Sequence, residues 1–156
     1  MDFLTLRTPG SQVSIEPATW RDFNQLRQLE RACFPKDAWP LLDLIGVLTL
    51  PNVVRLKAMS NSQMVGFIAG DVKKAENSAW IATVGVMPEF RSQGIGKALL
   101  QSCERRLEVA KISLNVRESN RAAVKLYEGA GYTRAGLWPT YYEDGEDALI
   151  MEKIRE

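Results

Sequence analysis

Residues 84–100 read VGVMPEFRSQGIGKALL, which joins the end of a strand, a short loop and the start of a helix. The first residues are β-branched and apolar, and Pro88 ends the strand because proline has no amide hydrogen to donate to a sheet. Gly94 and Gly96 then open a helix. Its apolar residues recur with the 3.6-residue period of one buried helix face, at Ile95, Leu99, Cys103 and Leu107.

The glycine loop before this helix predicts a phosphate-binding site. A loop that leads into a helix start presents unpaired backbone N–H groups and the positive end of the helix dipole. Arg91 adds a charged fork for the same kind of ligand. Two better-known phosphate loops do not fit. A dinucleotide loop needs glycine where Leu99 stands, and a triphosphate P-loop needs glycine at Arg91 and Ser or Thr at Ala98.

The composition bounds the class of protein. The 156 residues are 46% hydrophobic and 25% charged, which is typical of one globular domain, here residues 1–156. A net charge of +1 gives no general attraction to nucleic acid. The chain has no histidine, which argues against Ser-His-Asp and Cys-His catalysis and against most zinc sites, so no metal is expected. Cys33 and Cys103 lie in apolar helical patterns and are expected to be core thiols.

Neither the N-terminus nor the longest apolar run predicts export or membrane insertion. The first seven residues lack the apolar core and cleavage site of a signal peptide. The apolar run at 41–50 is interrupted by Asp43, and it is too short to cross a bilayer. We expect a cytoplasmic protein without membrane contacts.

The remaining pattern alternates between strands and helices. Thr19 and Asp22 form a capping box that predicts a helix with a buried face as far as Cys33. Residues 41–48 predict a short apolar helix that either packs into the core or walls a groove. Further helices are expected at 94–110 and 119–127, the second ended by Gly131, and strands at 13–16, 53–59, 64–72, 79–86, 112–116, 132–138 and 148–154. This order predicts a single domain of mixed α/β type.

Two motifs give the chain a family resemblance. The spacing Arg91-x-x-Gly94-x-Gly96 resembles the pyrophosphate-binding motif of the GCN5-related N-acetyltransferase family, which binds acetyl-coenzyme A. Residues 114–132 resemble the later motif of that family, with Asn120, small residues, Leu-Tyr and Gly-aromatic in the expected order. The resemblance implies an α/β (α+β) fold. Its mixed, mostly antiparallel central sheet would be flanked by helices and contain a splayed pair of parallel strands.

The resemblance also implies how acetyl-coenzyme A is held as co-substrate. Backbone amides of the loop would bind the pyrophosphate, and the strand before it would pair with the pantetheine arm and polarise the thioester carbonyl through an N–H. Gly85 would mark a bulge in this strand. Asn120 would bond the pantetheine or simply cap its helix. The implied binding residues are Val84, Gly85, Val86, Arg91, Ser92, Gln93, Gly94, Ile95, Gly96, Lys97, Asn120 and Tyr127.

The resemblance implies Tyr127 as the general acid that protonates the departing thiolate. Its structural alternative is a core tyrosine with one satisfied hydroxyl. Residues 139–151 look like those of ribosomal-protein and protein N-terminal acetyltransferases, in which a glutamate stands two residues before the arginine that corresponds to Arg117. Here Asn115 has that position, and an amide cannot accept a proton. Relatives that use a histidine and an earlier tyrosine give no candidate either, because the chain has no histidine and carries Trp80 at the earlier position.

The proton acceptor therefore stays open among three alternatives. Asn115 could hold a water that passes the proton outward, which we favour. A carboxylate of the last hairpin, at Glu143, Glu146 or Asp147, could reach the groove instead. An α-amino group, with a pKa near 8, could also need little help.

The acceptor itself is read from weaker features. The acidic hairpin is expected to be a solvated turn. If it faces the groove, it would attract a cationic amine that Tyr141 and Tyr142 could grip. The expected function is acetyl transfer to an amine, foremost a peptide or protein N-terminus. The alternatives are a small amine, such as a polyamine or amino acid, and a non-catalytic acyl-coenzyme A-binding module. A monomer or homodimer is expected.

Overall fold

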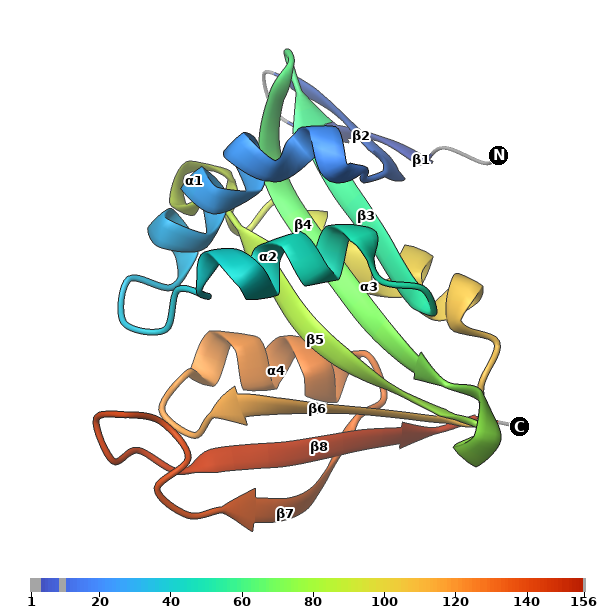
Figure 1. The fold of residues 1–156 in the computed structure, drawn as a ribbon, viewed down its shortest axis with the longest axis vertical. Coiled ribbons are helices and arrows are strands. Elements are labelled where there is room, and N and C mark those ends of the chain that lie inside the picture. Colours follow the sequence, from blue (N-terminus) through green and yellow to red (C-terminus); the bar gives the residue numbers. More distant parts are fainter. Residues whose placement is uncertain (1–3, 9–10, 156) are drawn as a thin grey trace.

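The computed structural model describes residues 4–8 and 11–155, which form one twisted sheet with helices on both faces (Figure 1). Residues 1–3, 9–10 and 156 lie outside the described residues, and with them part of the segment searched for a signal peptide. The strands are β1 (Leu4–Thr8), β2 (Ser11–Pro17), β3 (Val53–Ser60), β4 (Gln63–Lys73), β5 (Ser78–Val86), β6 (Lys111–Arg117), β7 (Thr133–Trp138) and β8 (Ala148–Ile154). They lie in the order β1-β2-β3-β4-β5-β6-β8-β7.

One strand pair in this sheet is parallel, and it soon separates. All other described neighbours are antiparallel, while β5 and β6 pair in parallel only at Ser78↔Lys111, Ala79↔Ile112 and Trp80↔Ser113. Beyond these pairs the two strands diverge, as the widening space between their ribbons shows (Figure 1). The expectation of a mixed, mostly antiparallel sheet with a splayed parallel pair is confirmed.

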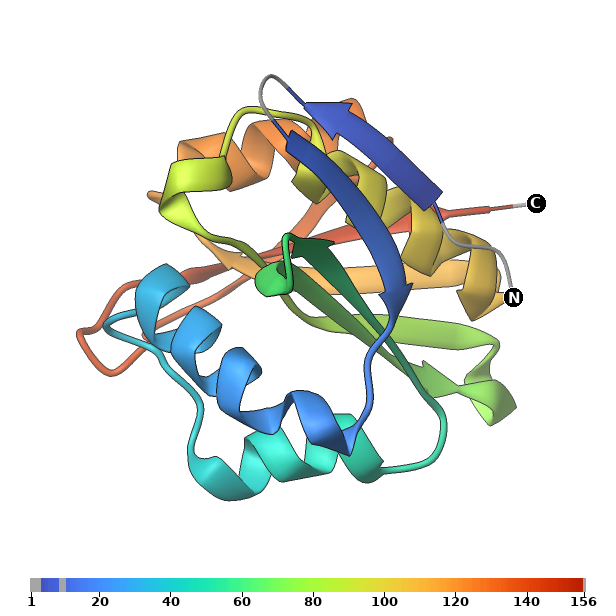
Figure 2. The same cartoon turned by 90° about the horizontal axis from the view of Figure 1, so that it is seen from above.

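In the described part of the chain, four α-helices cover the sheet, two on each face (Figure 2). They are α1 (Phe23–Cys33), α2 (Leu41–Thr49), α3 (Ile95–Leu107) and α4 (Arg121–Gly129). The capping box before α1 is present: the Thr19 amide donates to the Asp22 carboxylate over 2.8 Å. A short 3-10 turn at Trp20–Asp22 precedes the α-helix proper. Among the described residues, no helix is long and apolar enough to cross a membrane.

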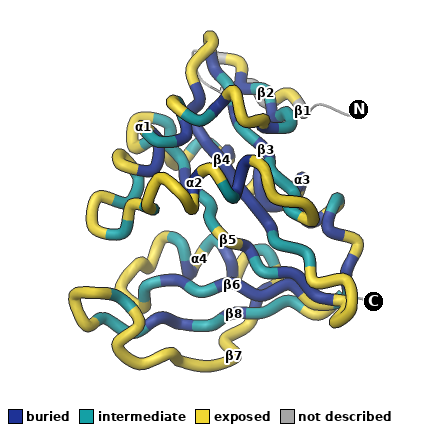
Figure 3. Tube along the Cα trace, in the orientation of Figure 1, coloured by how far each residue is buried: buried dark blue, intermediate teal, exposed yellow. Residues whose placement is uncertain are grey.

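Two hydrophobic layers hold these helices to the sheet. Leu99, Leu100 and Cys103 of α3 are fully buried on one face, and Leu26 and Leu29 of α1 are buried on the other. The dark-blue stretches in Figure 3 accordingly follow the central strands and the inner helix faces. For α2, core packing is confirmed for one face only. Its inner face is buried, while Leu41, Leu42 and Ile45 are exposed.

The sequence analysis missed β1 and misplaced one bulge. Strand β1 forms a hairpin with β2, so the expected first strand lies one position in from the sheet edge. The irregularity in β5 lies at Ala82, because Thr83 pairs with Ala69 while Ile81 pairs with Gly70. The bulge predicted at Gly85 is therefore wrong.

Gly85 pairs in regular register with Phe67, and its glycine has a different cause. A Cβ there would lie 3.2 Å from the Cys33 sulfur and 3.2 Å from the ring of Phe34. The missing side chain lets the end of α1 approach β5 closely. Cys33, expected to be a core thiol, is only half-buried, and its thiol donates to the Val86 carbonyl over 3.3 Å.

This close approach predicts that Gly85→Ala destabilises the fold. The added methyl must displace Cys33 and Phe34, and such overpacking typically costs about 1–3 kcal/mol. Chemical denaturation of both proteins measures the change. Gly129→Ala is the matched control, since nothing lies within 4 Å of its Cβ and alanine favours the helix. Equal effects of the two substitutions would contradict the steric explanation.

Candidate active site

Two cavities meet where β5 and β6 separate. The loop cavity, of about 570 Å³, lies between the end of α1, strand β5, residues 91–97 and α4. The hairpin cavity, of about 470 Å³, lies between residues 34–40, strands β5 and β6, and the loop between β7 and β8. They share part of their lining, including Val84, Asn120 and Tyr127. The two cavities are therefore neighbours at the place where the strands separate.

The loop cavity presents backbone N–H groups and positive charge, as anion-binding sites do. Ser92 and Gly94 have φ angles of 64° and 84°, and such left-handed residues turn successive N–H groups into one concavity. The amide of Ala98 donates to the Gly94 carbonyl over 3.0 Å, so the helical amides before it come too early for an intrahelical partner. Arg91 and Lys97 add positive charge to the lining. These residues fit a pyrophosphate group.

Most of the loop residues singled out from the sequence line this cavity. They are Arg91, Ser92, Gly94, Ile95, Gly96 and Lys97. Gln93 is not among the lining residues. Its side-chain oxygen is buried and has no hydrogen-bond partner among the described residues.

The β5 edge offers backbone groups to the same cavity. Val84, Gly85 and Val86 line it, and their strand is paired with β4 on its other side. The carbonyl of Val86 is already occupied, because it accepts hydrogen bonds from the Arg91 Nε over 3.0 Å and from the Cys33 thiol. An extended ligand arm beside β5 must therefore use other backbone groups or displace these donors.

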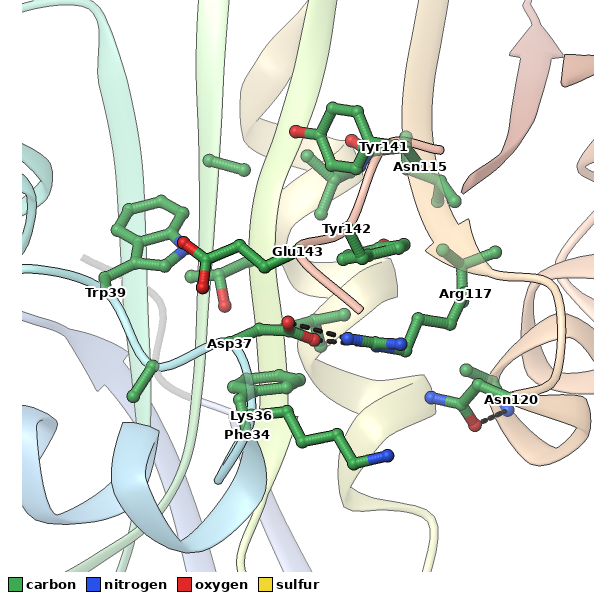
Figure 4. Close-up of a pocket in the computed structure, with 18 of the residues that line it drawn as sticks. Phe34, Lys36, Asp37, Trp39, Asn115, Arg117, Asn120, Tyr141, Tyr142 and Glu143 are labelled. Atoms are coloured by element: carbon green, nitrogen blue, oxygen red, sulfur yellow. Dashed lines mark hydrogen bonds and ion pairs between the residues drawn. The ribbon is translucent and has the colours of Figure 1, made fainter. Parts of the chain in front are cut away.

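Two side chains of the α4 motif lie where the cavities meet. Tyr127 is only 6% exposed, and burial raises the pKa of its hydroxyl well above the usual value, so the group stays protonated at neutral pH. The Asn120 oxygen accepts from the Ala123 amide over 3.2 Å and caps α4. Its amide nitrogen lies on the other side of the group (Figure 4). The capping role is thus present, and the NH₂ group keeps its donors.

One guanidinium closes the hairpin cavity on one side. Arg117, at the end of β6, donates to both oxygens of Asp37 over 2.7 and 2.8 Å, as the dashed lines in Figure 4 show. The same group donates to Asp144 over 2.9 and 3.1 Å and to Glu146 over 2.8 Å. It also stacks on the ring of Tyr142, 4.2 Å from its centre. Arg117 thereby ties residues 34–40 to the loop between β7 and β8.

The acidic residues of the last hairpin have two kinds of surroundings: some accept hydrogen bonds from the backbone, and one lines a cavity. Glu146 also accepts from the Ser119 amide over 2.8 Å, and Asp147 accepts from the Thr140 amide over 2.8 Å. Of the three carboxylates weighed as proton acceptors, Glu143 is the one that lines the hairpin cavity. Tyr141 and Tyr142 line it too.

Asn115 also lines the hairpin cavity. It stands half-buried on β6 beside Tyr142. Burial raises the pKa of Tyr142, and a hydrogen bond with the Asn115 side chain opposes this rise to a smaller extent. The cavity lining does not include Trp80, which belongs to the paired start of β5.

The sequence analysis missed a buried carboxyl group beside this site. Glu30 of α1 is 1% exposed and accepts a hydrogen bond from the Thr83 hydroxyl over 3.1 Å. Its second oxygen, Oε2, has no partner among the described residues. Burial raises the pKa of Glu30 to about 7, against a smaller lowering effect of the Thr83 hydrogen bond. A signal existed, because Glu30 falls on the apolar face marked by Leu26 and Leu29.

Comparisons with known proteins agree on one family. The family model described as Acetyltransferase (GNAT) family matches residues 21–132. An N-acetyltransferase of Methanocaldococcus jannaschii, named as uncharacterized, is 35% identical over 138 residues, covering 85% of this chain and 86% of that protein. The N-alpha-acetyltransferase RimI of Mycobacterium tuberculosis is 31% identical over 146 residues, covering 90% and 92%. The structure of the Escherichia coli ribosomal-protein-S18-alanine N-acetyltransferase has a TM-score of 0.81 and 28% identity, covering 91% and 93%.

The burial of Glu30 predicts an unusual dependence of stability on pH. Because the pKa is higher in the folded state, the folded chain binds more protons than the unfolded chain between about pH 4.5 and 7, and stability falls as pH rises through that window. Glu30→Gln removes this charge. The free energy of unfolding of Glu30→Gln, relative to that of the wild type, should therefore be about 2–3 kcal/mol higher at pH 8 than at pH 5.

Urea denaturation at the two pH values measures this gain. Glu104→Gln is the matched control: Glu104 is also buried, but it accepts from the Tyr132 hydroxyl over 2.8 Å and from Lys153. Its substitution should cost stability at both pH values, since Lys153 loses its partner. A Glu30→Gln variant with a constant difference from the wild type would show that Glu30 titrates normally.

Proposed function

The chain belongs to the acetyltransferase (GNAT) family, and we propose that it transfers acetyl from acetyl-coenzyme A to the α-amino group of a peptide or protein N-terminus. It is an acetyl-coenzyme A-dependent N-acetyltransferase; the acceptor and the residue roles are the proposal. The observation that carries the proposal is the meeting of the two cavities at Tyr127. One cavity suits the coenzyme, and the other leaves room for a second substrate beside the thioester.

The loop cavity would hold the donor. Amides of residues 92–97 would bind the pyrophosphate, with Arg91 beside them. The pantetheine arm would lie along β5 at residues 84–86, with the Asn120 amide as a further donor. This arm would enter the space where β5 lacks a neighbour, and the thioester would then lie between the two cavities.

The chemistry needs a polarised carbonyl and a protonated leaving group. A backbone N–H of β5 that points at the carbonyl oxygen would stabilise the oxyanion, and one such donor is typically worth about 3–4 kcal/mol of barrier. The amine attacks the carbonyl carbon, the C–N bond forms, and the C–S bond breaks. Tyr127 would give its proton to the departing thiolate. Burial keeps the hydroxyl protonated at neutral pH, so the proton is present when negative charge develops on the sulfur.

The hairpin cavity would hold the acceptor. Its walls combine the aromatic rings of Tyr141, Tyr142 and Trp39 with the carboxylates of Asp37 and Glu143. Aromatic walls suit the first side chain of a peptide, and acidic groups attract its ammonium. The names of the relatives support the same class of acceptor, since they include an N-alpha-acetyltransferase and a ribosomal-protein-alanine N-acetyltransferase.

This proposal predicts that the chain acetylates short peptides with free N-termini. Thiol release from acetyl-coenzyme A should exceed background with such peptides and vanish when the same peptides are already N-acetylated. Polyamines and free amino acids serve as the comparison acceptors. A faster reaction with a small amine than with the peptides would contradict the peptide acceptor and indicate a small-molecule acetyltransferase. Coenzyme binding without thiol release for any acceptor would indicate a binding module.

The role of Tyr127 predicts a specific loss in Tyr127→Phe. Removal of a general acid typically lowers kcat by about 10²–10⁴-fold, while the dissociation constant of coenzyme A should change little. Steady-state kinetics and calorimetry provide the two measurements. Tyr132→Phe is the matched control. The ring of Tyr132 packs against that of Tyr127, with 6.0 Å between the ring centres, but its hydroxyl donates a hydrogen bond to Glu104. An equal loss in both variants would refute the acid role.

A further inference from the structure

Glu30 lies against a third cavity beside the site. This side cavity, of about 230 Å³, lies between α1, the start of α2 and residues 38–40. Ala38, Trp39 and Pro40 line both the side cavity and the hairpin cavity, so the two cavities are neighbours. Glu30 belongs to the lining of the side cavity, and Thr83, its hydrogen-bond donor, belongs to the lining of the hairpin cavity. The pair therefore bridges the two spaces.

Thr83 occupies a particular place on the strand. It follows Ala82, the extra residue of the β5 bulge, and it lies beyond the last residue that pairs with β6. Residues 81–84 line the hairpin cavity as one run, just before the segment proposed to hold the pantetheine arm. A hydroxyl at this position faces the space in which the amine must approach the thioester.

We propose that Thr83 and Glu30 form the proton relay that deprotonates the attacking amine, an inference that rests on the proposed function. The ammonium would give one proton to the Thr83 oxygen as the Thr83 hydroxyl proton passes to Oε1 of Glu30. The carboxylate becomes a carboxylic acid and the amine becomes neutral. As the C–N bond forms and the C–S bond breaks, Tyr127 would give its proton to the thiolate, and the second amine proton would return to Tyr127. Glu30 then returns its proton to solvent.

The neighbouring carboxylates are less suited to this role. Asp37, Asp144 and Glu146 already accept charged hydrogen bonds from Arg117, and Glu143 is exposed. Glu30 is buried, and its Oε2 atom has no partner among the described residues. An unsatisfied buried carboxyl group costs stability, so its presence calls for a role other than folding. The side cavity is large enough for water, which would carry the proton away.

The surroundings of Glu30 allow it to change charge during turnover. From its own helix it shares the side cavity with Arg27 and Arg31, and the Cys33 thiol lies close enough for the two charges to interact. From the other elements it meets the Thr83 hydroxyl of β5, and Trp39, Leu41 and Leu44 line the same cavity. Burial sets its pKa at about 7, where a proton acceptor both takes and releases protons readily.

The test is the pH profile of kcat, measured with the full chain, acetyl-coenzyme A and a peptide that it acetylates. The wild type should show kcat rising with pH through an inflection near 7. In Glu30→Gln this inflection should disappear, and kcat at neutral pH should fall by about 10²-fold. What activity remains should rise only through the amine's own pKa, near 8. The dissociation constant of coenzyme A should stay unchanged, since Glu30 is outside the loop cavity lining.

Variants of Thr83 test the relay without touching the carboxyl group. Thr83→Val keeps the shape and removes the hydroxyl, and it should reproduce the loss seen in Glu30→Gln. Thr83→Ser restores a hydroxyl and should recover most of the rate and the inflection. Glu104→Gln, a buried carboxyl variant away from both cavities, should keep the wild-type profile.

Three results would overturn the proposal. A Glu30→Gln enzyme with the wild-type inflection and a rate within a few-fold of wild type shows that Glu30 takes no proton. Loss of the inflection in Asn115→Ala, with Glu30→Gln unaffected, assigns the step to water held by Asn115. A wild-type chain that binds coenzyme A but acetylates none of the acceptors contradicts the proposed function, and the relay falls with it.

Discussion

The rest of the structure depends on the early separation of β5 from β6. After three parallel pairs, the last at Trp80↔Ser113, both strands continue without each other. A sheet in this state leaves backbone N–H and C=O groups that need other partners. The bulge at Ala82 adds to the separation by breaking the regular register of β5. The edge of β5 beyond Trp80 therefore lies open beside the two cavities.

Separated strands inside a packed domain must be held apart as well as opened. On one side the end of α1 rests against Gly85, where even a methyl group would be too close. On the other side Tyr127 of α4 lines both cavities. Beside the opening, Arg117 donates charged hydrogen bonds to two separate segments, to Asp37 before α2 and to Glu146 in the loop between β7 and β8. A rigid planar fork suits this task, because it fixes direction as well as distance.

The sequence predicts local features of this site well and long-range ones poorly. The glycine loop, the helix that follows it and the Asn120 cap depend on neighbours within a few residues, and all three are present. The Glu30–Thr83 bond joins residues 53 apart, and the Arg117–Asp37 pair joins residues 80 apart. No local period encodes such pairs. The bulge is similar, since it is defined by register against β4 and not by a residue type such as glycine.

Burial gives the two proposed proton-transfer groups opposite roles through a single cause. Desolvation disfavours the charged form of any acid, so it raises the pKa of Tyr127 and of Glu30 alike. The pKa of the phenol starts near 10 and is raised further, so the hydroxyl carries its proton at neutral pH. The carboxyl group starts near 4.5 and arrives at about 7, which makes it an effective acceptor at the pH where the amine is still protonated. The site can therefore hold a protonated phenol and a carboxyl group that titrates near neutral pH in a chain without histidine.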